Sequence, residues 1–218
     1  MRKAKNKQQS ELIFPARLTE RYRPERLVDF IGMERPKKVF QAFAQNPRSE
    51  AFLLWGPSGL GKTSMALALA KEIGAEIHHI ASQQCTVDAI QEVSRRCWYV
   101  PMGGRFHVVL VDEADRMTNL AQLALLSKLD ATEPSPNTIW IFTCNETSGL
   151  ERRFLSRCKV LEFDRKTVKA GLSLLLRRVW RQEAPATAPL PDFDLMANFS
   201  GGNVRDAMNN LELEVMAL

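Results

Sequence analysis

The segment from Gly56 to Thr63, Gly-Pro-Ser-Gly-Leu-Gly-Lys-Thr, constrains this chain more than any other. It has the spacing glycine, four residues, Gly-Lys-Thr, between an apolar stretch at 52–55 and a helix-forming stretch at 64–71. Glycines let backbone N–H groups point at phosphate oxygens, and the next helix offers its positive end to the same anion. We therefore predict a strand–loop–helix unit that binds phosphate, with Lys62 on the β/γ-phosphates and the Thr63 hydroxyl on Mg²⁺. The residues predicted to hold a nucleotide here are Gly56, Pro57, Ser58, Gly59, Leu60, Gly61, Lys62, Thr63 and Ser64.

Composition places the chain among ordinary globular proteins, since 45% of its 218 residues are hydrophobic and 25% are charged. No apolar run approaches the roughly 20 residues that a membrane span needs, and the basic N-terminus lacks the apolar core of a secretory signal. We expect a cytoplasmic or nuclear-type compartment and no membrane partner. The four cysteines include no Cys-x-x-Cys pair, which favours reduced structural thiols over a zinc module.

The positive charge is concentrated at the N-terminus. Residues 1–50 hold 12 Lys and Arg against 6 Asp and Glu, whereas the other residues hold 18 against 19. A basic arm of this kind can bind nucleic acid phosphates or can be a solvated tail, and charge alone leaves both open.

Strand and helix patterns alternate over the first three quarters of the chain. Strands are expected over 52–55, 76–80, 106–111, 138–144 and 160–163, and helices over 35–44, 64–71, 86–98 and 119–129. This alternation predicts an α/β fold with a doubly wound parallel sheet. Beyond it only helices are expected, over 168–180, 193–199 and 203–216. We predict a basic flexible tail (1–16), an α/β core (17–165) and a small helical lid (166–218).

Polar residues follow two of the predicted strands. Asp112 and Glu113 come directly after an apolar run, and Asn145 follows the next strand. A carboxylate at a strand's C-terminal end faces the ligand crevice of an open α/β sheet. We predict that Asp112 holds Mg²⁺, that Glu113 polarises the attacking water, and that Asn145 orients that water.

Two arginines are further candidates. Arg157 follows Asn145 and lies away from the phosphate loop in the sequence, so it is suited to a neighbouring subunit's γ-phosphate. Arg205 stands at the start of the last predicted helix and is placed to reach bound phosphates from the lid. On spacing alone, a surface arginine and a helix-start pair with Asp206 remain open for these two positions.

Six motifs in order resemble those of the AAA+ clamp-loader family, in particular the replication factor C small subunit and its archaeal and phage counterparts. They are Glu20-Arg21-Tyr22-Arg23-Pro24 with Asp29-Phe30-Ile31-Gly32, the Lys62-Thr63 loop (Walker A), Asp112-Glu113-Ala114-Asp115 (Walker B), Asn145 (sensor 1), Ser156-Arg157-Cys158 (arginine-finger box) and Gly202-Asn203-Val204-Arg205 (sensor 2). The Walker motifs are generic, whereas Tyr-Arg-Pro and Ser-Arg-Cys are more specific. The resemblance spans roughly residues 17–216.

This resemblance implies a RecA-like core that binds ATP and Mg²⁺ and belongs to an oligomer of AAA+ subunits. Such machines open a ring-shaped sliding clamp and place it at a DNA primer–template junction. The resemblance implies an adenine pocket and an Arg157 that acts in trans. It also implies that the helices starting near residues 86 and 118 follow the DNA backbone, with Gln122 coupling DNA to the ATP site. The implied adenine-pocket residues are Tyr22, Arg23, Pro24 and Ile31.

The sequence departs from the family pattern in three places. Cys85 stands where an arginine would favour DNA, and Leu126-Ser127 stands where paired arginines are common. Fewer fixed charges there predict weaker DNA binding, because phosphate neutralisation dominates affinity. The resemblance ends before the helical collar that holds family members in a ring, so we expect either a truncated chain or a small subunit that assembles through its ATPase domains.

Other functions compete with clamp loading. An AAA+ ATPase of DNA repair, of the replication-restart or branch-migration kind, would have the same phosphate loop. An assembly module would bind nucleotide, hydrolyse little and donate Arg157 to a neighbour. The letters Asp-Glu-Ala-Asp at 112–115 also occur in DEAD-box helicases, but that class needs a second RecA-like domain for which 218 residues leave no room.

Overall fold

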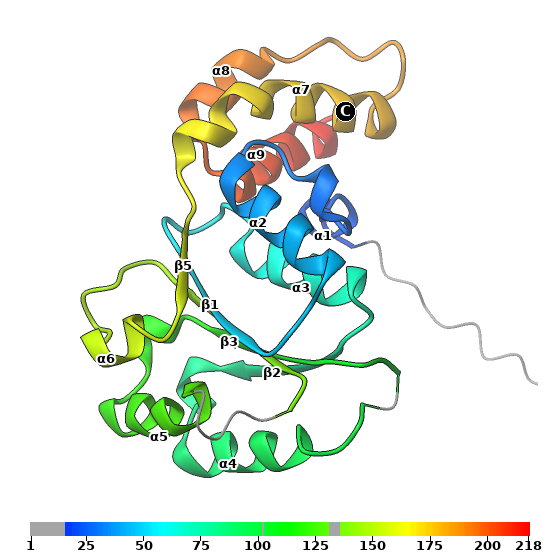
Figure 1. Cartoon of the computed structure of the whole chain (residues 1–218). Helices are drawn as coiled ribbons and strands as arrows, with labels where there is room; N and C mark the ends of the chain where they lie inside the picture. Colours follow the sequence, from blue (N-terminus) through cyan, green and yellow to red (C-terminus); the bar gives the residue numbers. More distant parts are fainter. Residues whose placement is uncertain (1–15, 102, 131–135) are drawn as a thin grey trace, which may run out of the picture.

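The computed structural model describes residues 16–101, 103–130 and 136–218, and its centre is a five-stranded parallel sheet in the order β2-β3-β4-β1-β5 (Figure 1). The predicted α/β class with a parallel sheet is confirmed. Most of the predicted N-terminal tail, residues 1–15, lies outside the described residues. The strands are β1 (Glu50–Trp55), β2 (Glu76–Ala81), β3 (His107–Asp112), β4 (Thr138–Cys144) and β5 (Lys159–Glu162).

Helices cover both faces of the sheet because the central strands are apolar on both sides. Every residue of β4 is buried, and alternate residues of β3 enter two different clusters. The helices α2 (Glu34–Gln45) and α3 (Lys62–Glu72) pack on one face, whereas α4 (Val87–Arg96), α5 (Asn119–Leu129) and α6 (Arg152–Leu155) pack on the other (Figure 1). Short 3₁₀ turns span Leu27–Asp29, Ser82–Gln84 and Ala114–Arg116.

Several elements begin or end one to three residues away from the expected bounds, and two of these differences have a clear physical cause. The helix predicted over 86–98 ends at Arg96, and the following Trp98 and Tyr99 are exposed rather than packed. The helix predicted over 168–180 extends over Arg165–Glu183, because the Asp164 carboxylate caps its start by accepting from the Lys166 N–H. Polar residues extend a helix beyond its apolar stripe, so the stripe alone underestimates its length.

The C-terminal helices form a third hydrophobic cluster with the N-terminal turn. They are α7 (Arg165–Glu183), α8 (Phe193–Phe199) and α9 (Val204–Met216), and the turn is α1 (Leu18–Arg21). The Arg21 guanidinium donates twice to Glu183 of α7, at 2.8 and 2.7 Å, and the Leu18 N–H donates to Glu212 of α9. The two ends of the described chain therefore meet in one unit above the sheet (Figure 1). Within the described residues, no helix is both long and apolar enough to cross a bilayer.

Candidate nucleotide site

The polar residues predicted for the site come together where three neighbouring strands end. The phosphate loop follows β1, Asp112 ends β3, and Asn145 follows β4, which lies between those two strands. Because the strands are parallel, their carboxyl ends lie at the same edge of the sheet. The chain passes from β4 on one side of β1 to β5 on the other, so this edge is also where the strand order switches.

The phosphate loop needs its glycines for shape and for space. Gly56, Gly59 and Gly61 have φ angles of 140°, 77° and 85°, which residues with side chains rarely adopt. A Cβ atom on Gly59 would lie 1.8 Å from the Asn203 side-chain oxygen. The Gly59 carbonyl also accepts from the Val204 N–H at 3.1 Å, so the loop lies directly against the start of α9.

The Lys62 side chain is buried in the loop, with 8% of its surface exposed. Its ammonium donates to the carbonyls of Gly56 (2.6 Å) and Pro57 (2.9 Å) and to the side-chain oxygen of Asn145 (3.1 Å). Burial lowers the pKa of Lys62, although nearby acidic groups, among them Asp115, act in the opposite direction. A hydrogen bond thus joins two predicted residues: Lys62, at the end of the loop that follows β1, and Asn145, just after the neighbouring strand β4.

The Asp112 carboxylate is the centre of a small polar network. Its Oδ1 accepts from the hydroxyls of Thr63 and Thr143, both at 2.8 Å, and His79 Nε2 lies 2.7 Å from its Oδ2. Thr63 and Asp112 were both predicted as magnesium ligands, and the structure places them in contact. Sequence reasoning missed His79 and Thr143, because their positions beside Asp112 depend on strand register.

Glu113 and Asp115 lie just beyond that network. Glu113 has a left-handed backbone with φ 54°, and its half-exposed carboxylate lies 3.3 Å from Arg116. Asp115 accepts from the backbone N–H of Asn145 at 3.4 Å, and its other oxygen is buried with no hydrogen-bond partner among the described residues. Asp115, which received no predicted role, therefore adds an acidic oxygen beside Lys62 and Asn145.

A cavity of about 640 Å³ opens beside the loop. It is lined by the N-terminal segment, the phosphate loop and the C-terminal helices α7 and α9. Segments far apart in the sequence therefore surround one cavity. Tyr22 is fixed in this wall, because its hydroxyl donates to Glu183 of α7. The predicted site residues that line the cavity are Tyr22, Arg23, Pro24, Ile31, Gly59, Leu60, Gly61, Ser64 and Arg205.

Arg157 does not line that cavity. It follows α6, where Phe154 packs into the cluster on the α4–α5 face. Its guanidinium donates to both oxygens of Asp130, at 2.8 and 3.0 Å, and to the Arg153 carbonyl. The hydrogen bonds from Arg157 lower the pKa of Asp130. Within one subunit this arginine is held by Asp130. Other predicted site residues also lie outside the cavity lining, among them Lys62, Thr63, Asp112, Glu113 and Asn145.

The residues present fit a magnesium-bound nucleoside triphosphate. A polyphosphate needs cationic and N–H donors, and Lys62 supplies an ammonium where α3 begins. That helix start, at Gly61, has no side-chain cap among the described residues. Mg²⁺ prefers oxygen ligands, and the Thr63 hydroxyl and the Asp112 carboxylate provide them side by side. The cavity volume lies within the range usual for small-molecule and cofactor sites.

Comparison with known proteins assigns the family. Residues 52–165, slightly more than half of the chain, match the sequence model of the ATPase family associated with various cellular activities (AAA). This chain belongs to the AAA family. It is 30% identical over 202 residues to the replication factor C small subunit of Picrophilus torridus and 30% identical over 205 residues to replication factor C subunit 2 of Arabidopsis thaliana. These matches cover 89% and 88% of the chain, which resembles replication factor C small subunits as predicted.

The same relatives are longer than this AAA chain, which spans about three fifths of their length, 62% and 60%. Among solved structures, the Thermotoga maritima RuvB Holliday junction branch migration motor matches 90% of the chain and 72% of its own with a TM-score of 0.68. Its sequence identity is 21%, so this likeness concerns the fold. It agrees with the parallel sheet and the C-terminal helices α7–α9 described above.

Proposed function

We propose that this AAA chain is an ATP-binding and ATP-hydrolysing subunit of a clamp-loader-like complex that acts on DNA in replication. The observation that carries the proposal is the joining of Lys62 to Asn145 and of Thr63 to Asp112 beside a cavity formed by the N-terminal segment, the loop and the lid. The similarity to replication factor C subunits over most of the chain supports the choice of complex.

Each residue's proposed role follows from its chemistry. Lys62 and the first N–H groups of α3 would bind the phosphates, and Thr63 and Asp112 would hold Mg²⁺, which neutralises phosphate charge when bound. Glu113 would accept the proton of the attacking water, and Asn145 would orient that water without adding charge. Arg205, at the cavity wall, would contact the phosphates from the lid. Tyr22, Arg23, Pro24 and Ile31 would surround the base.

The proposed DNA face lies on the α4–α5 side of the sheet. Both helices begin after a threonine, and each threonine hydroxyl accepts one N–H of its first turn at 3.2 Å. The remaining N–H groups of those turns can contact phosphates. Gln122 is buried in α5, where it donates to Gly149 and accepts from the Glu151 N–H just before α6. Gln122 thus connects the proposed DNA face to the helix that precedes Arg157.

The structure adds a reason to expect weak DNA binding. Cys85, at the position where the family pattern has an arginine, is 3% exposed and its sulfur lies 3.6 Å from the Met117 sulfur. That position is therefore part of the hydrophobic cluster on the α4–α5 side of the sheet, and contributes no charge to the face.

Steady-state ATPase assays test the proposed function. The turnover of the chain is compared alone, with primed single-stranded DNA circles, and with the same DNA plus a ring-shaped sliding clamp. We expect stimulation by the DNA and a further stimulation by the clamp. Stimulation by DNA alone would instead favour a repair or branch-migration ATPase, and no response to either would favour an assembly module with little turnover.

Glu113→Gln is expected to bind ATP normally and to lower turnover by about 10²-fold or more, because an amide of the same shape cannot accept the proton. ATP affinity is measured by calorimetry and turnover by phosphate release. Glu214→Gln, an exposed position on α9, is the matched control and should keep both values. Unchanged turnover in Glu113→Gln would assign the general base to another residue.

A further inference from the structure

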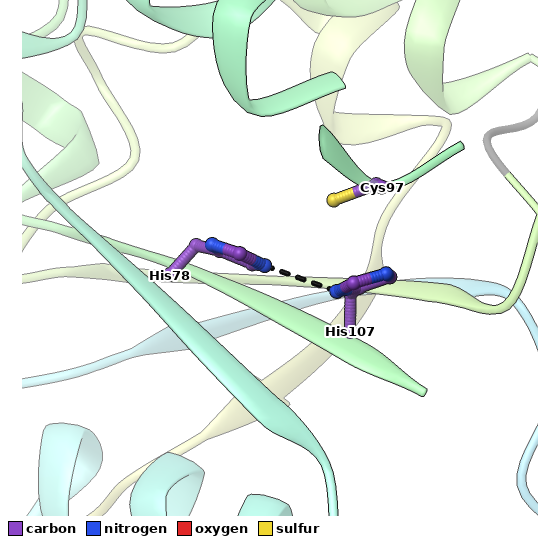
Figure 2. A group of neighbouring side chains, drawn as sticks. All are labelled: His78, Cys97 and His107. Atoms are coloured by element: carbon purple, nitrogen blue, oxygen red, sulfur yellow. Dashed lines mark hydrogen bonds between the residues drawn. The ribbon is translucent and has the colours of Figure 1, made fainter. Parts of the chain in front are cut away.

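A second group of ligand-type side chains lies away from the nucleotide site. His78 of β2, His107 at the start of β3 and Cys97 just after α4 point toward one another (Figure 2). His78 Nε2 lies 3.0 Å from His107 Nδ1, and the ligand atoms of all three side chains lie within 4.8 Å of one another. Because β3 starts at His107 and ends at Asp112, this cluster lies near the strand ends opposite the phosphate loop.

Strand geometry explains why these residues meet. Glu76 pairs with His107 in the β2–β3 register, and His78 points to the same face as Glu76 because side chains alternate along a strand. The helix α4 covers that face and ends at Arg96, which leaves Cys97 above the two histidines. The next residue of β2, His79, points to the opposite face of the sheet and contacts Asp112, so it is not part of this cluster.

The hydrogen bonds of His107 prepare it to bind a metal. Its Nε2 lies 2.8 Å from the Tyr99 carbonyl, so in the neutral ring that nitrogen carries the proton and Nδ1 carries a lone pair. Nδ1 of His107 faces Nε2 of His78 (Figure 2). A ligating histidine usually donates its second N–H to such a backbone oxygen, which fixes the ring and its tautomer.

The distances suit a tetrahedral ion. Two histidine nitrogens bound to Zn²⁺ at the usual bond length lie about 3.3 Å apart, close to the 3.0 Å found between His78 and His107. Zinc sites combine imidazole and thiolate ligands and take a fourth ligand from a carboxylate or water. Glu76 Oε1 lies 3.8 Å from His78 Nε2, on the same face of β2, and is in position to supply that ligand.

Burial favours the neutral forms of Cys97 and His78. Cys97 and His107 are 1% and 2% exposed, and the Cys97 thiol also contacts Thr138. Burial raises the pKa of Cys97 to about 11 and lowers the pKa of His78. A bound dication would displace the thiol proton to solvent and take the thiolate as its ligand, and the proton on His78 Nε2 would move to Nδ1 through solvent.

We propose that His78, His107 and Cys97 bind one divalent transition-metal ion of the zinc class, with Glu76 or water as the fourth ligand. The site is structural: it joins the edge strand β2, the strand β3 and the end of α4, and it steadies the exposed segment Trp98–Val100 through the Tyr99 carbonyl. The sequence disfavours a zinc module because no Cys-x-x-Cys pair occurs. That criterion does not apply to this site, because its ligands come from three separate elements.

Cobalt titration tests the proposal without any activity measurement. Chelator-treated protein is titrated with Co²⁺ in excess Mg²⁺ and without nucleotide. We expect one equivalent to bind with a thiolate-to-cobalt charge-transfer band, and Zn²⁺ to remove that band. Cys97→Ser should abolish the band, and His78→Gln should weaken metal affinity by at least about tenfold.

Two matched variants separate this site from other ligands. Cys158→Ser removes the partly exposed thiol, and His79→Gln removes the histidine beside Asp112; both should keep the band. At the same Zn²⁺ concentration the melting temperature of the wild type should rise more than that of His78→Gln, which tests the site even if Cys97→Ser fails to fold. A wild type without the band, or a band that persists in folded Cys97→Ser, would overturn the proposal and leave a histidine pair joined by a hydrogen bond.

Discussion

Lys62→Ala is expected to abolish detectable nucleotide binding, and ATP hydrolysis with it. The Lys62 ammonium is the buried cation of the phosphate loop, and it is oriented by the Gly56 and Pro57 carbonyls and by Asn145. A fixed charge of this kind, in a site shielded from water, stabilises phosphate charge far more than a solvated one. Loss of one such donor commonly lowers turnover by about 10²-fold to 10³-fold, and here substrate binding is lost as well. Equilibrium titration with a fluorescent ATP analogue measures binding, and phosphate release measures turnover.

Lys71→Ala is the matched control for that experiment. Lys71 lies on the same helix α3, but its ammonium is solvent-exposed and pairs with Glu25. Its removal changes net charge equally, so affinity and turnover should stay near those of the wild type. Thermal unfolding of both variants establishes that they are folded. Wild-type ATP affinity in a folded Lys62→Ala protein would rule out the proposed phosphate site.

The parts of this site that sequence could predict are those encoded by contiguous residues. The loop at 56–63 needs only its own glycines and flanking elements, and Asp112 and Asn145 are each marked by a preceding apolar strand. Parallel pairing of β1, β3 and β4 then brings those ends together without further information. The fold class follows from the same alternation of strands and helices.

The contacts that sequence could not predict depend on register and on distant segments. Thr143 and His79 reach Asp112 only because of the pairing of β3 with its two neighbours. The Tyr22 hydroxyl is bound by Glu183, which is 161 residues away in the chain. No spacing rule links such positions, because the separation between them is set by the packing of the lid on the N-terminal turn. The cluster of His78, Cys97 and His107 escaped prediction for the same reason.

Arg157→Ala is expected to lower ATP turnover about 10³-fold or more in assembled protein, with little effect on nucleotide affinity. Arg157 lies outside the cavity of its own subunit, and its guanidinium is held by Asp130. We expect Arg157 to contact the nucleotide of a neighbouring subunit, so its loss should lower ATP turnover only when subunits are assembled. The dependence of turnover on protein concentration, compared between wild type and Arg157→Ala, measures this effect.

Arg153→Ala provides the matched control, because Arg153 is an exposed arginine of α6 whose side chain pairs with Glu151. It should retain wild-type turnover at every concentration. The Asp130 pair is partly exposed, and exposed ion pairs are weak, so Arg157 can exchange Asp130 for a phosphate oxygen at little cost. Asp130→Asn should accordingly leave turnover intact or raise it.

Mixing two inactive variants decides whether Arg157 acts in trans. Glu113→Gln subunits keep Arg157 and should still bind ATP, whereas Arg157→Ala subunits keep a complete ATP site. In a mixed assembly, an Arg157→Ala site beside a Glu113→Gln subunit has every proposed catalytic group, so turnover should rise well above that of either variant alone. Because each protein is inactive for a different reason, no rescue at any mixing ratio under conditions where they associate would confine Arg157 to a structural role.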